Sequence, residues 1–240
     1  MKIVVFGPFN GGKSTFVRKL CASGSVHIDK QGTTVALDHG MKTHFGIPVS
    51  LFGTPGLERF EVLRKILSRG ADGAIMILDS ANQGSFEESK KLFAQVFKYL
   101  PEDTPILVCA NKQDIDDAEK PERILELVDI DESDIVSVIG ISALKGVNLD
   151  RALGIMVLSV LSRYKNRLLT VQEYGLKGLP VISQQWDVKE EEGRQFLQWL
   201  SWRQLILADW EEELFMLPRP VREILDILDY AKTVTKSMEA

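Results

Sequence analysis

The chain has 240 residues, and its 45% apolar content is enough for one large domain or one domain with an extension. The formal net charge of −5 argues against a nucleic-acid-binding surface, which normally shows as an excess of Lys and Arg. No apolar run reaches the roughly 18 residues of a transmembrane helix, and neither end shows a secretory or lipidation motif, so we expect a cytoplasmic protein without an integral membrane segment.

The first part of the sequence alternates short apolar runs with amphipathic stretches. Runs rich in Val and Ile, bounded by Gly, Pro, Asn or Asp, predict buried parallel strands at residues 2–6, 49–52, 73–79, 106–110 and 135–141. Residues 33–46 predict a further strand that turns antiparallel into the strand at 49–52. The stretches between them predict helices at 13–20, 58–68, 86–100, 121–127 and 148–164.

This alternation indicates a three-layer α/β domain over residues 1–165, with a mostly parallel six-stranded sheet and one antiparallel strand. Ser85 and Glu88 predict a capping box before the third helix, and Pro121 suits the first turn of the fourth. The two cysteines, Cys21 and Cys109, lie far apart, so we expect buried, reduced thiols.

The alternation stops near residue 165, and the remainder, residues 166–240, predicts a helical C-terminal extension. Apolar residues at helical spacing predict a helix over 190–213 and, after a break at Leu217-Pro218-Arg219-Pro220, another over 221–232. All four tryptophans fall in this extension: Trp186, Trp199, Trp202 and Trp210. Two interpretations are open: the aromatic side chains extend the core of the first domain, or they form a partner-binding or dimerising surface.

A glycine-rich loop, Gly7-Pro8-Phe9-Asn10-Gly11-Gly12-Lys13-Ser14, joins the first strand to the first helix. It fits the phosphate-binding pattern G-x-x-x-x-G-K-[ST] in the context that this pattern requires. Backbone N–H groups and the helix dipole would hold phosphates, Lys13 would reach the β- and γ-phosphates, and Ser14 would hold Mg²⁺. We expect the nucleotide phosphates to contact Gly7, Asn10, Gly11, Gly12, Lys13, Ser14 and Thr15.

A second motif, Asn111-Lys112-Gln113-Asp114, follows the strand at 106–110, at the strand end where ligands bind in such sheets. Asp114 would accept two hydrogen bonds from the guanine N1–H and exocyclic amine, a donor pair that adenine lacks. Asn111 would brace the neighbouring loops, and the stem of Lys112 would cover the base.

A third segment, Ser142-Ala143-Leu144-Lys145, follows the last predicted strand. The backbone N–H of Ala143 could donate to the guanine O6, and we expect Ser142, Ala143 and Leu144 beside the base. The tetrapeptide is not specific on its own; its order and place after the other two motifs give it meaning.

Together these motifs resemble the Ras-like small GTPases across residues 1 to about 165. The residues of the phosphate-binding loop and of the two switch segments resemble those of a prokaryotic branch related to the Arf, Rab and gliding-motility GTPases. The resemblance implies that Thr34 is the switch I threonine, which binds Mg²⁺ and senses the γ-phosphate. It also implies that Gly56 is the switch II glycine, whose N–H meets the γ-phosphate, so Lys13, Thr34 and Gly56 are the expected catalytic residues. The resemblance to this prokaryotic branch rests on three segments: Gly7-Pro8-Phe9-Asn10, Thr33-Thr34-Val35-Ala36-Leu37-Asp38-His39-Gly40 and Gly53-Thr54-Pro55-Gly56-Leu57-Glu58-Arg59-Phe60.

The sequence departs from the family pattern at the metal side. Most Ras-like proteins begin switch II with an Asp that helps to hold Mg²⁺ through water, but here the residue is Gly53. Two interpretations are open. Either Asp38 takes over this role, because an antiparallel pairing places the start of one strand beside the end of the next, or Asp38 is an exposed strand residue.

Further departures concern hydrolysis. Leu57 replaces the Gln that usually orients the attacking water, and Phe9 replaces a small residue, where its bulk could block an arginine finger from a partner. Arg59 either acts as an internal arginine or pairs with a switch carboxylate.

The sequence therefore predicts an enzyme that binds GTP, GDP and Mg²⁺, hydrolyses GTP slowly and acts as a nucleotide-dependent molecular switch. The alternative is a hydrolysis-impaired scaffold that holds GTP or GDP almost permanently. We expect protein regulators or effectors at the switch loops, and at the Trp-rich extension if it forms a surface.

Overall fold

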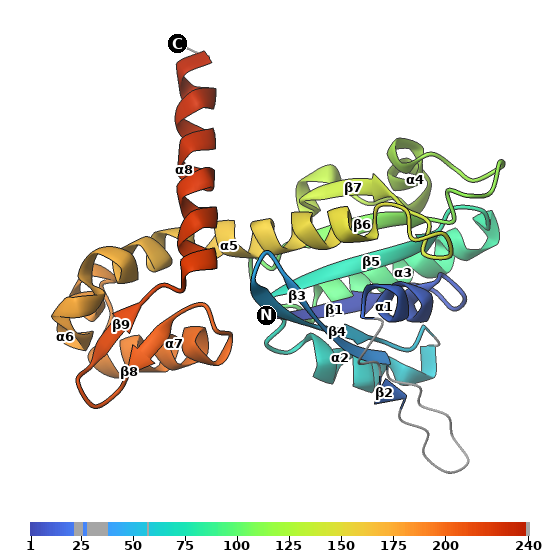
Figure 1. The fold of residues 1–240 in the computed structure, drawn as a ribbon. Helices are drawn as coiled ribbons and strands as arrows, with labels where there is room; N and C mark the ends of the chain where they lie inside the picture. Colours follow the sequence, from blue (N-terminus) through green and yellow to red (C-terminus); the bar gives the residue numbers. More distant parts are fainter. Residues whose placement is uncertain (22–25, 28–37, 57, 239–240) are drawn as a thin grey trace. The chain divides into compact units, whose positions relative to one another are not determined.

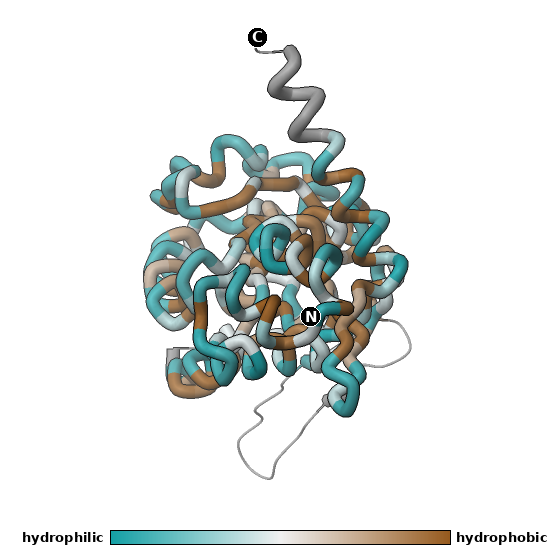
Figure 2. The backbone as a smooth tube through the Cα atoms, turned by 90° about the vertical axis from the view of Figure 1, so that its left-hand side faces the viewer, coloured by the Kyte–Doolittle hydropathy of each residue, from teal (hydrophilic) through white to brown (hydrophobic). Residues whose placement is uncertain are grey.

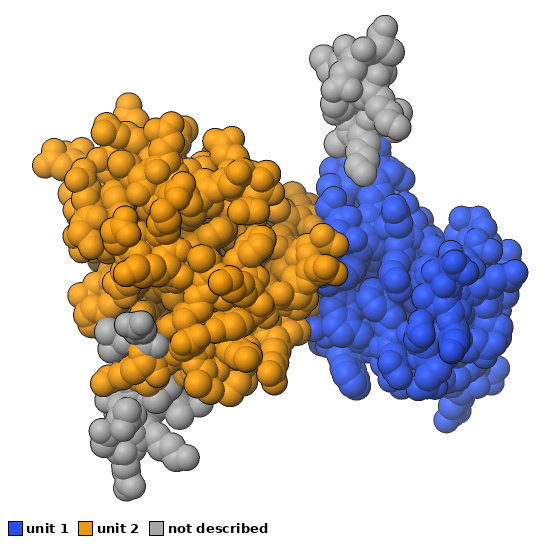
Figure 3. All heavy atoms as spheres, turned by 180° about the vertical axis from the view of Figure 1, so that it is seen from behind, with its two compact units in different colours: residues 1, 43–48, 161–240 blue, residues 2–42, 49–160 orange. Residues whose placement is uncertain are grey.

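The computed structural model describes residues 1–21, 26–27, 38–56 and 58–238 (Figure 1). Thr34 and Leu57, to which the sequence assigned roles, lie outside these described residues. The chain divides into two compact units (Figure 3). The larger unit comprises Lys2–Lys42 and Val49–Val160, and the smaller comprises Met1, Thr43–Pro48 and Leu161–Ala240.

One sheet with the strand order β2-β3-β4-β1-β5-β6-β7 forms the centre of the first part of the chain (Figure 1). Strand β1 pairs in parallel with β4 and β5, and β5, β6 and β7 continue in parallel. The strands are β1 (Lys2–Phe6), β2 (Val26–His27), β3 (Asp38–His44), β4 (Ile47–Gly53), β5 (Gly73–Asp79), β6 (Ile106–Asn111) and β7 (Ser137–Gly140).

The β3 strand is the antiparallel one, because a two-residue turn joins it to β4. Phe45 and Gly46 both have left-handed backbone angles, with φ of 50° and 74°, as tight hairpin turns require. The predicted six-stranded, mostly parallel sheet with one antiparallel strand is confirmed. The two-residue strand β2 adds a seventh at the β3 edge; it is too short to give an apolar run in the sequence.

Helices cover both faces of this sheet. One core cluster joins β5 and β6 to α3 (Phe86–Phe97) and α4 (Pro121–Val128). On the opposite face, Gly73 of β5 leaves room for Met156 and Val160 of α5 (Leu149–Tyr174), because a Cβ there would lie 2.3 Å from the Met156 sulfur. The remaining helices here are α1 (Lys13–Leu20) and α2 (Glu61–Ser68), with short 3-10 turns η1 (Glu58–Phe60), η2 (Gln83–Ser85) and η3 (Glu132–Asp134).

The predicted capping box at Ser85 is wrong. The η2 turn leads directly into α3, so Ser85 already has helical backbone angles, and its side chain caps no N–H of the helix. Instead, the Ser85 hydroxyl donates to the Asn82 carbonyl at 2.7 Å. Pro121 does occupy the first turn of α4, as predicted.

The two cysteines are free and buried, as expected. Burial raises the pKa of the Cys21 thiol and that of the Cys109 thiol. Within the described part of the chain, no helix combines the length and apolarity that crossing a bilayer requires.

The smaller unit contains the end of α5, η4 (Gly175–Lys177), α6 (Leu179–Gln185), α7 (Glu190–Trp202), β8 (Leu207–Asp209), β9 (Leu214–Met216) and α8 (Arg219–Met238). Polar and apolar residues alternate along the first half of α8 (Figure 2).

The predicted single helix over 190–213 is wrong, because α7 ends at Trp202. Gln204 has a left-handed φ of 56°, and the chain then forms an antiparallel hairpin in which Leu207 faces Met216. The Asp209 carboxylate accepts hydrogen bonds from the N–H groups of Glu211 and Glu212, both at 3.1 Å, which turns the chain between the strands.

Three of the four tryptophans are partly buried and contact other aromatic rings of the smaller unit. Trp199 stacks on Phe196 with ring centroids 5.3 Å apart, and Trp186 meets the same Phe196 ring edge-on at 5.4 Å. Trp210 packs edge-on against Phe215 at 5.3 Å. Trp202 differs, since 78% of it is exposed.

Candidate functional site

The loop after β1 encloses a cavity of about 380 Å³ at the carboxyl ends of the strands. The switch II segment after β4 and the first residue of β3 complete its walls. The lining residues are Phe9, Asn10, Gly12, Lys13, Ser14, Thr15, Arg18, Asp38, Thr54, Pro55, Gly56 and Phe60. The cavity therefore brings together most of the residues that the sequence assigned to phosphate and metal binding.

Asn111 joins this phosphate loop to the loop after β7. It is 2% exposed; its side-chain amide donates to the Gly11 carbonyl, and its carbonyl accepts from the Ala143 N–H, both at 2.8 Å. Gly12 makes this approach possible: its φ is 101°, and a Cβ there would lie 2.1 Å from the Asn111 amide nitrogen. Contact between the Ala143 N–H and a base oxygen would thus require this hydrogen bond to be shared or exchanged.

Lys13 is held inside the loop by backbone oxygens. Its ammonium donates to the carbonyls of Gly7 at 2.9 Å and Pro8 at 2.7 Å. Burial lowers the pKa of Lys13 to about 8, against the opposing effect of the nearby carboxylates of Glu88 and Asp38. A phosphate bound here would meet a cation that little water reaches, so their attraction would be weakly screened.

Asp38 lies at the start of β3 and lines the cavity together with Ser14. It is only 4% exposed, so the interpretation of Asp38 as an exposed strand residue is wrong. A Cβ on Gly53 would lie 3.1 Å from the Asp38 Cβ and 3.5 Å from its Oδ2. The carboxylate therefore lies beside the position at which most Ras-like proteins carry the switch II aspartate.

The donor set fits Mg²⁺ held jointly with a nucleotide. Mg²⁺ usually takes one or two protein oxygen ligands and completes its shell with water and substrate phosphates. Ser14 offers a hydroxyl and Asp38 a carboxylate in the same cavity. No group of three or more His, Cys, Asp or Glu side chains among the described residues could hold a metal ion. A metal centre built from described side chains alone therefore does not fit.

Gly56 lies directly on the phosphate loop. A Cβ at this position would be 2.6 Å from the Phe9 nitrogen and 2.8 Å from the Pro8 carbonyl carbon, so no other residue fits without movement. Thr54, two residues earlier, donates its N–H to the Val5 carbonyl at 2.8 Å and extends the β1–β4 pairing. These contacts bring the switch II backbone beside the loop that carries Lys13.

On the base side, Asp114 is exposed at its loop, and its Oδ1 accepts a hydrogen bond from the Ser142 hydroxyl at 2.5 Å. The same hydroxyl accepts from the Lys145 N–H at 3.0 Å, which fixes the loop after β7. Leu144, expected beside the base, is 64% exposed. The Asp114 carboxylate is thus held in place by Ser142.

Two charged residues of this region were missed by the sequence reasoning. Asp79, at the end of β5 and 3% exposed, pairs with Lys112 at 2.5 Å. Arg64 of α2 is 1% exposed and donates to the Gln95 side chain at 2.8 and 3.1 Å and to the Pro55 carbonyl at 3.1 Å. Arg64 thereby ties the switch II loop to α2 and α3.

The described contact of Arg59 is with an aromatic ring, and its two expected roles stay predictions. Its guanidinium lies over the Phe60 ring, 4.9 Å from the centroid. Phe9 is 56% exposed and lines the cavity together with Phe60. The rim of the cavity beside switch II is therefore aromatic.

Comparison with known proteins finds similarity to one protein family and to several of its members. A model of the Ras family matches residues 2–162. An uncharacterized protein of Methanocaldococcus jannaschii is 31% identical over 123 residues, which cover 51% of this chain and 76% of that protein. Ras-related protein Rab-5B of Plasmodium falciparum is 30% identical over 172 residues, covering 70% and 81% of the two chains. Ras-related protein Rab-1D of Dictyostelium discoideum is 27% identical over 176 residues, covering 72% and 83%.

Proposed function

Because this chain belongs to the Ras family of small GTPases, we propose that it binds GTP and GDP, hydrolyses GTP slowly and works as a nucleotide-dependent switch. In this proposal residues 1–165 are the nucleotide-binding domain and residues 166–240 are an extension. That the chain belongs to a prokaryotic branch of this family stays a prediction from the amino-acid sequence of its loops.

One observation carries the proposal: Asn111, 100 residues from Gly11 in sequence, bonds to its carbonyl, and so connects the base-selecting motif to the phosphate loop. Asp114, oriented by Ser142, would take the N1–H and exocyclic amine of guanine. Leu144 and the stem of Lys112 would cover the base. Asn10 and Thr15 would contact the phosphates with the loop backbone.

The phosphate end would be controlled by charge and by contact with switch II. Lys13 would stabilise the β- and γ-phosphates, and the Gly56 N–H would sense the γ-phosphate. Mg²⁺ would neutralise phosphate charge when bound, held by Ser14, by Thr34 and, through water, by Asp38 in place of the missing aspartate at Gly53. The burial of Asp38 beside Gly53 supports this last assignment.

Slow hydrolysis follows from the residues around the γ-phosphate. Leu57 has no group that could orient an attacking water, and such positioning supplies much of the catalysis in phosphoryl transfer. Phe9 and Phe60 add an aromatic rim where an arginine from a partner would otherwise enter. Partners would instead recognise the exposed apolar residues of α2, Val62 and Ile66. A cytoplasmic location fits the two free, buried thiols.

A second candidate function, a scaffold that keeps its nucleotide, is favoured by the same Leu57 and Gly53. Single-turnover hydrolysis of bound GTP, read by HPLC, separates the two. We expect slow conversion to GDP in the wild type and a rate at least about tenfold higher in Leu57→Gln. The same change at an exposed leucine of the smaller unit, Leu176→Gln, is the matched control and should leave the rate unaltered.

Three results would decide against the switch. GTP that stays intact over many hours in the wild type and in Leu57→Gln favours the scaffold. Rapid wild-type turnover that Leu57→Gln does not change removes the argument from Leu57. A protein that binds neither guanine nucleotide contradicts both candidate functions.

A further inference from the structure

The β3–β4 hairpin is shared between the two compact units. The ends of its strands at the cavity, Asp38 of β3 and Gly53 of β4, belong to the larger unit. Its tip, Thr43–Pro48, belongs to the smaller unit together with Leu161–Ala240 (Figure 3). Because hydrogen-bonded strands resist stretching along their length, a displacement at one end of this hairpin is carried to the other.

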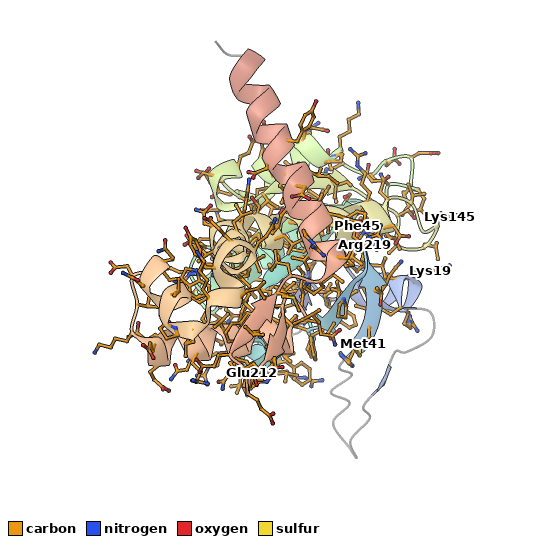
Figure 4. The ribbon with its side chains drawn as sticks, turned by 60° about the vertical axis from the view of Figure 1, so that its left-hand side comes forward. Lys19, Met41, Phe45, Lys145, Glu212 and Arg219 are labelled. Carbon is orange, nitrogen blue, oxygen red and sulfur yellow. The ribbon has the colours of Figure 1, made fainter. Side chains whose placement is uncertain are left out.

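The tip is packed into the smaller unit without slack. Gly46 has a φ of 74°, and a Cβ there would lie 2.7 Å from Cγ and 2.8 Å from Cβ of Pro220, in the first turn of α8. Phe45 and Arg219, labelled in Figure 4, precede the two residues in contact. Ile47 is 1% exposed, and the amino terminus of Met1 donates to the Pro48 carbonyl at 2.6 Å. Close packing of this kind transmits a shift rather than absorbing it.

The other end of the hairpin borders the phosphates. Asp38 lines the cavity with Lys13, and Gly53 leads directly into the segment that places Gly56 against the phosphate loop. A γ-phosphate present in GTP and absent in GDP would therefore change the contacts at the start of β3 and the end of β4. A ligand shifts a conformational equilibrium only through such a difference in contacts.

We propose that the β3–β4 hairpin carries the nucleotide state from the phosphate cavity to the first turn of α8, which makes the C-terminal unit the output of the switch. This inference rests on the proposed function. It assigns the Gly46–Pro220 contact the role of the coupling joint. By linkage, the same joint makes the C-terminal unit bias the choice between GDP and GTP.

The test is amide hydrogen exchange of the full chain, bound either to GDP or to the non-hydrolysable guanosine 5′-(β,γ-imido)triphosphate. We expect exchange in the first two turns of α8 to differ by about fivefold or more between the two complexes, the lower range of allosteric coupling. Pro220→Ala removes the ring atom nearest Gly46 and should reduce this difference. It should also change the ratio of the two nucleotide affinities by the same factor that the exchange difference loses.

Gly46→Ala disturbs the same contact from the hairpin, because the added methyl group would clash with Pro220, and it has a matched control. Gly70 has a φ of 64° with nothing within 4 Å of an added Cβ, so Gly70→Ala imposes similar backbone strain without a clash. We expect the exchange difference to be lost in Gly46→Ala and kept in Gly70→Ala. A purely structural weakening would lower both nucleotide affinities alike and leave their ratio constant, which would count against the joint.

The outcomes separate this inference from the function on which it rests. If the wild type binds neither nucleotide, the proposed function fails and the inference with it. If both bind and α8 exchanges identically in the two complexes, the function stands and the inference is overturned. It is also overturned if the difference persists unchanged in both Pro220→Ala and Gly46→Ala.

Discussion

On the base side of the site, Asn111 joins two loops through hydrogen bonds of 2.8 Å, and Ser142 orients Asp114 at 2.5 Å. On the phosphate side, α2 buries Arg64 and Ser68 but leaves Val62 70% and Ile66 55% exposed. The first arrangement is a connected polar network, whereas the second reverses the usual distribution of apolar and charged residues on a helix.

This contrast indicates which contacts a displacement of each side would break. Displacing the base-side loops breaks several hydrogen bonds of buried groups, each worth about 1 kcal/mol or more. Displacing α2 changes little at Val62 and Ile66, which are already in contact with solvent, but it breaks the hydrogen bonds that the buried Arg64 donates to Gln95 and Pro55. In the proposed switch we expect the base-side loops to stay fixed and α2 to be the part that responds to the γ-phosphate.

The largest expected effect tests the fixed side. Asp114→Asn removes the acceptor of the guanine donor pair and should weaken GDP binding by about a thousandfold or more, while xanthosine diphosphate binding improves. The fold should persist, because Asn still offers Ser142 an acceptor. Fluorescence titration with both diphosphates measures the effect, and Asp116→Asn, in the same exposed loop, is the control. Equal loss in both variants would show that the loop, not the carboxylate, selects the base.

A smaller effect is expected at the metal on the phosphate side. Asp38→Asn should weaken apparent Mg²⁺ affinity by about tenfold, the usual cost of losing an outer-sphere ligand. The GDP dissociation rate measured over a Mg²⁺ titration reports this as a shift of the midpoint. Asp129→Asn is the control, since its carboxylate is 75% exposed and pairs with Lys90. If the midpoint does not shift in Asp38→Asn, Asp38 does not replace the metal-binding aspartate that most Ras-like proteins carry at the position of Gly53.

The buried ammonium gives a pH dependence of similar size. Because burial lowers the pKa of Lys13 to about 8, GDP affinity in chelator should fall about tenfold between pH 7 and pH 9 as the charge is lost. Stability has the opposite sign: the cost of burying the charged form is present below pH 8 and disappears as pH rises toward 10.5, the ordinary value. Calorimetry across this range checks both. Lys13→Arg keeps its charge, so any affinity that it retains should not vary with pH.

The smallest effect is expected on the surface of α2. Val62→Ser and Ile66→Ser should change the free energy of unfolding by less than about 0.5 kcal/mol, because both side chains are exposed. The buried comparator Ile77→Val, in β5, should cost about 1 kcal/mol. Urea denaturation measures all three. A large loss at Val62 would mean that α2 is anchored through this face and is not the movable side.

The sequence predicts best those elements that are determined by residues close to one another in the chain. The β5 strand was predicted with its observed bounds, because a short apolar run with two Ile residues, bounded by Gly and Asp, is typical of a buried strand. The helix over 190–213 failed because Leu205-Ile206-Leu207 fits a helical face and a strand equally well. The position of Asp38 beside Gly53 was predicted, because antiparallel strand pairing is regular; its role in metal binding stays a prediction.

The burial of Arg64 and Asp79 could not be predicted from the residues next to them in the sequence. An arginine is normally exposed, and the burial of Arg64 depends on partners from other elements, among them the Gln95 side chain and the Pro55 carbonyl. Asp79 is buried against Lys112, 33 residues away. The roles of Thr34 and Leu57 stay predictions from the family pattern.

The contact between Gly12 and Asn111 also has a consequence for how this sequence can change over generations. A methyl group at position 12 would occupy the place of the Asn111 amide, so position 12 cannot accept a side chain while Asn111 keeps its present place. A substitution at position 12 should therefore be tolerated only in a sequence that has already replaced Asn111, although the two positions lie nearly a hundred residues apart.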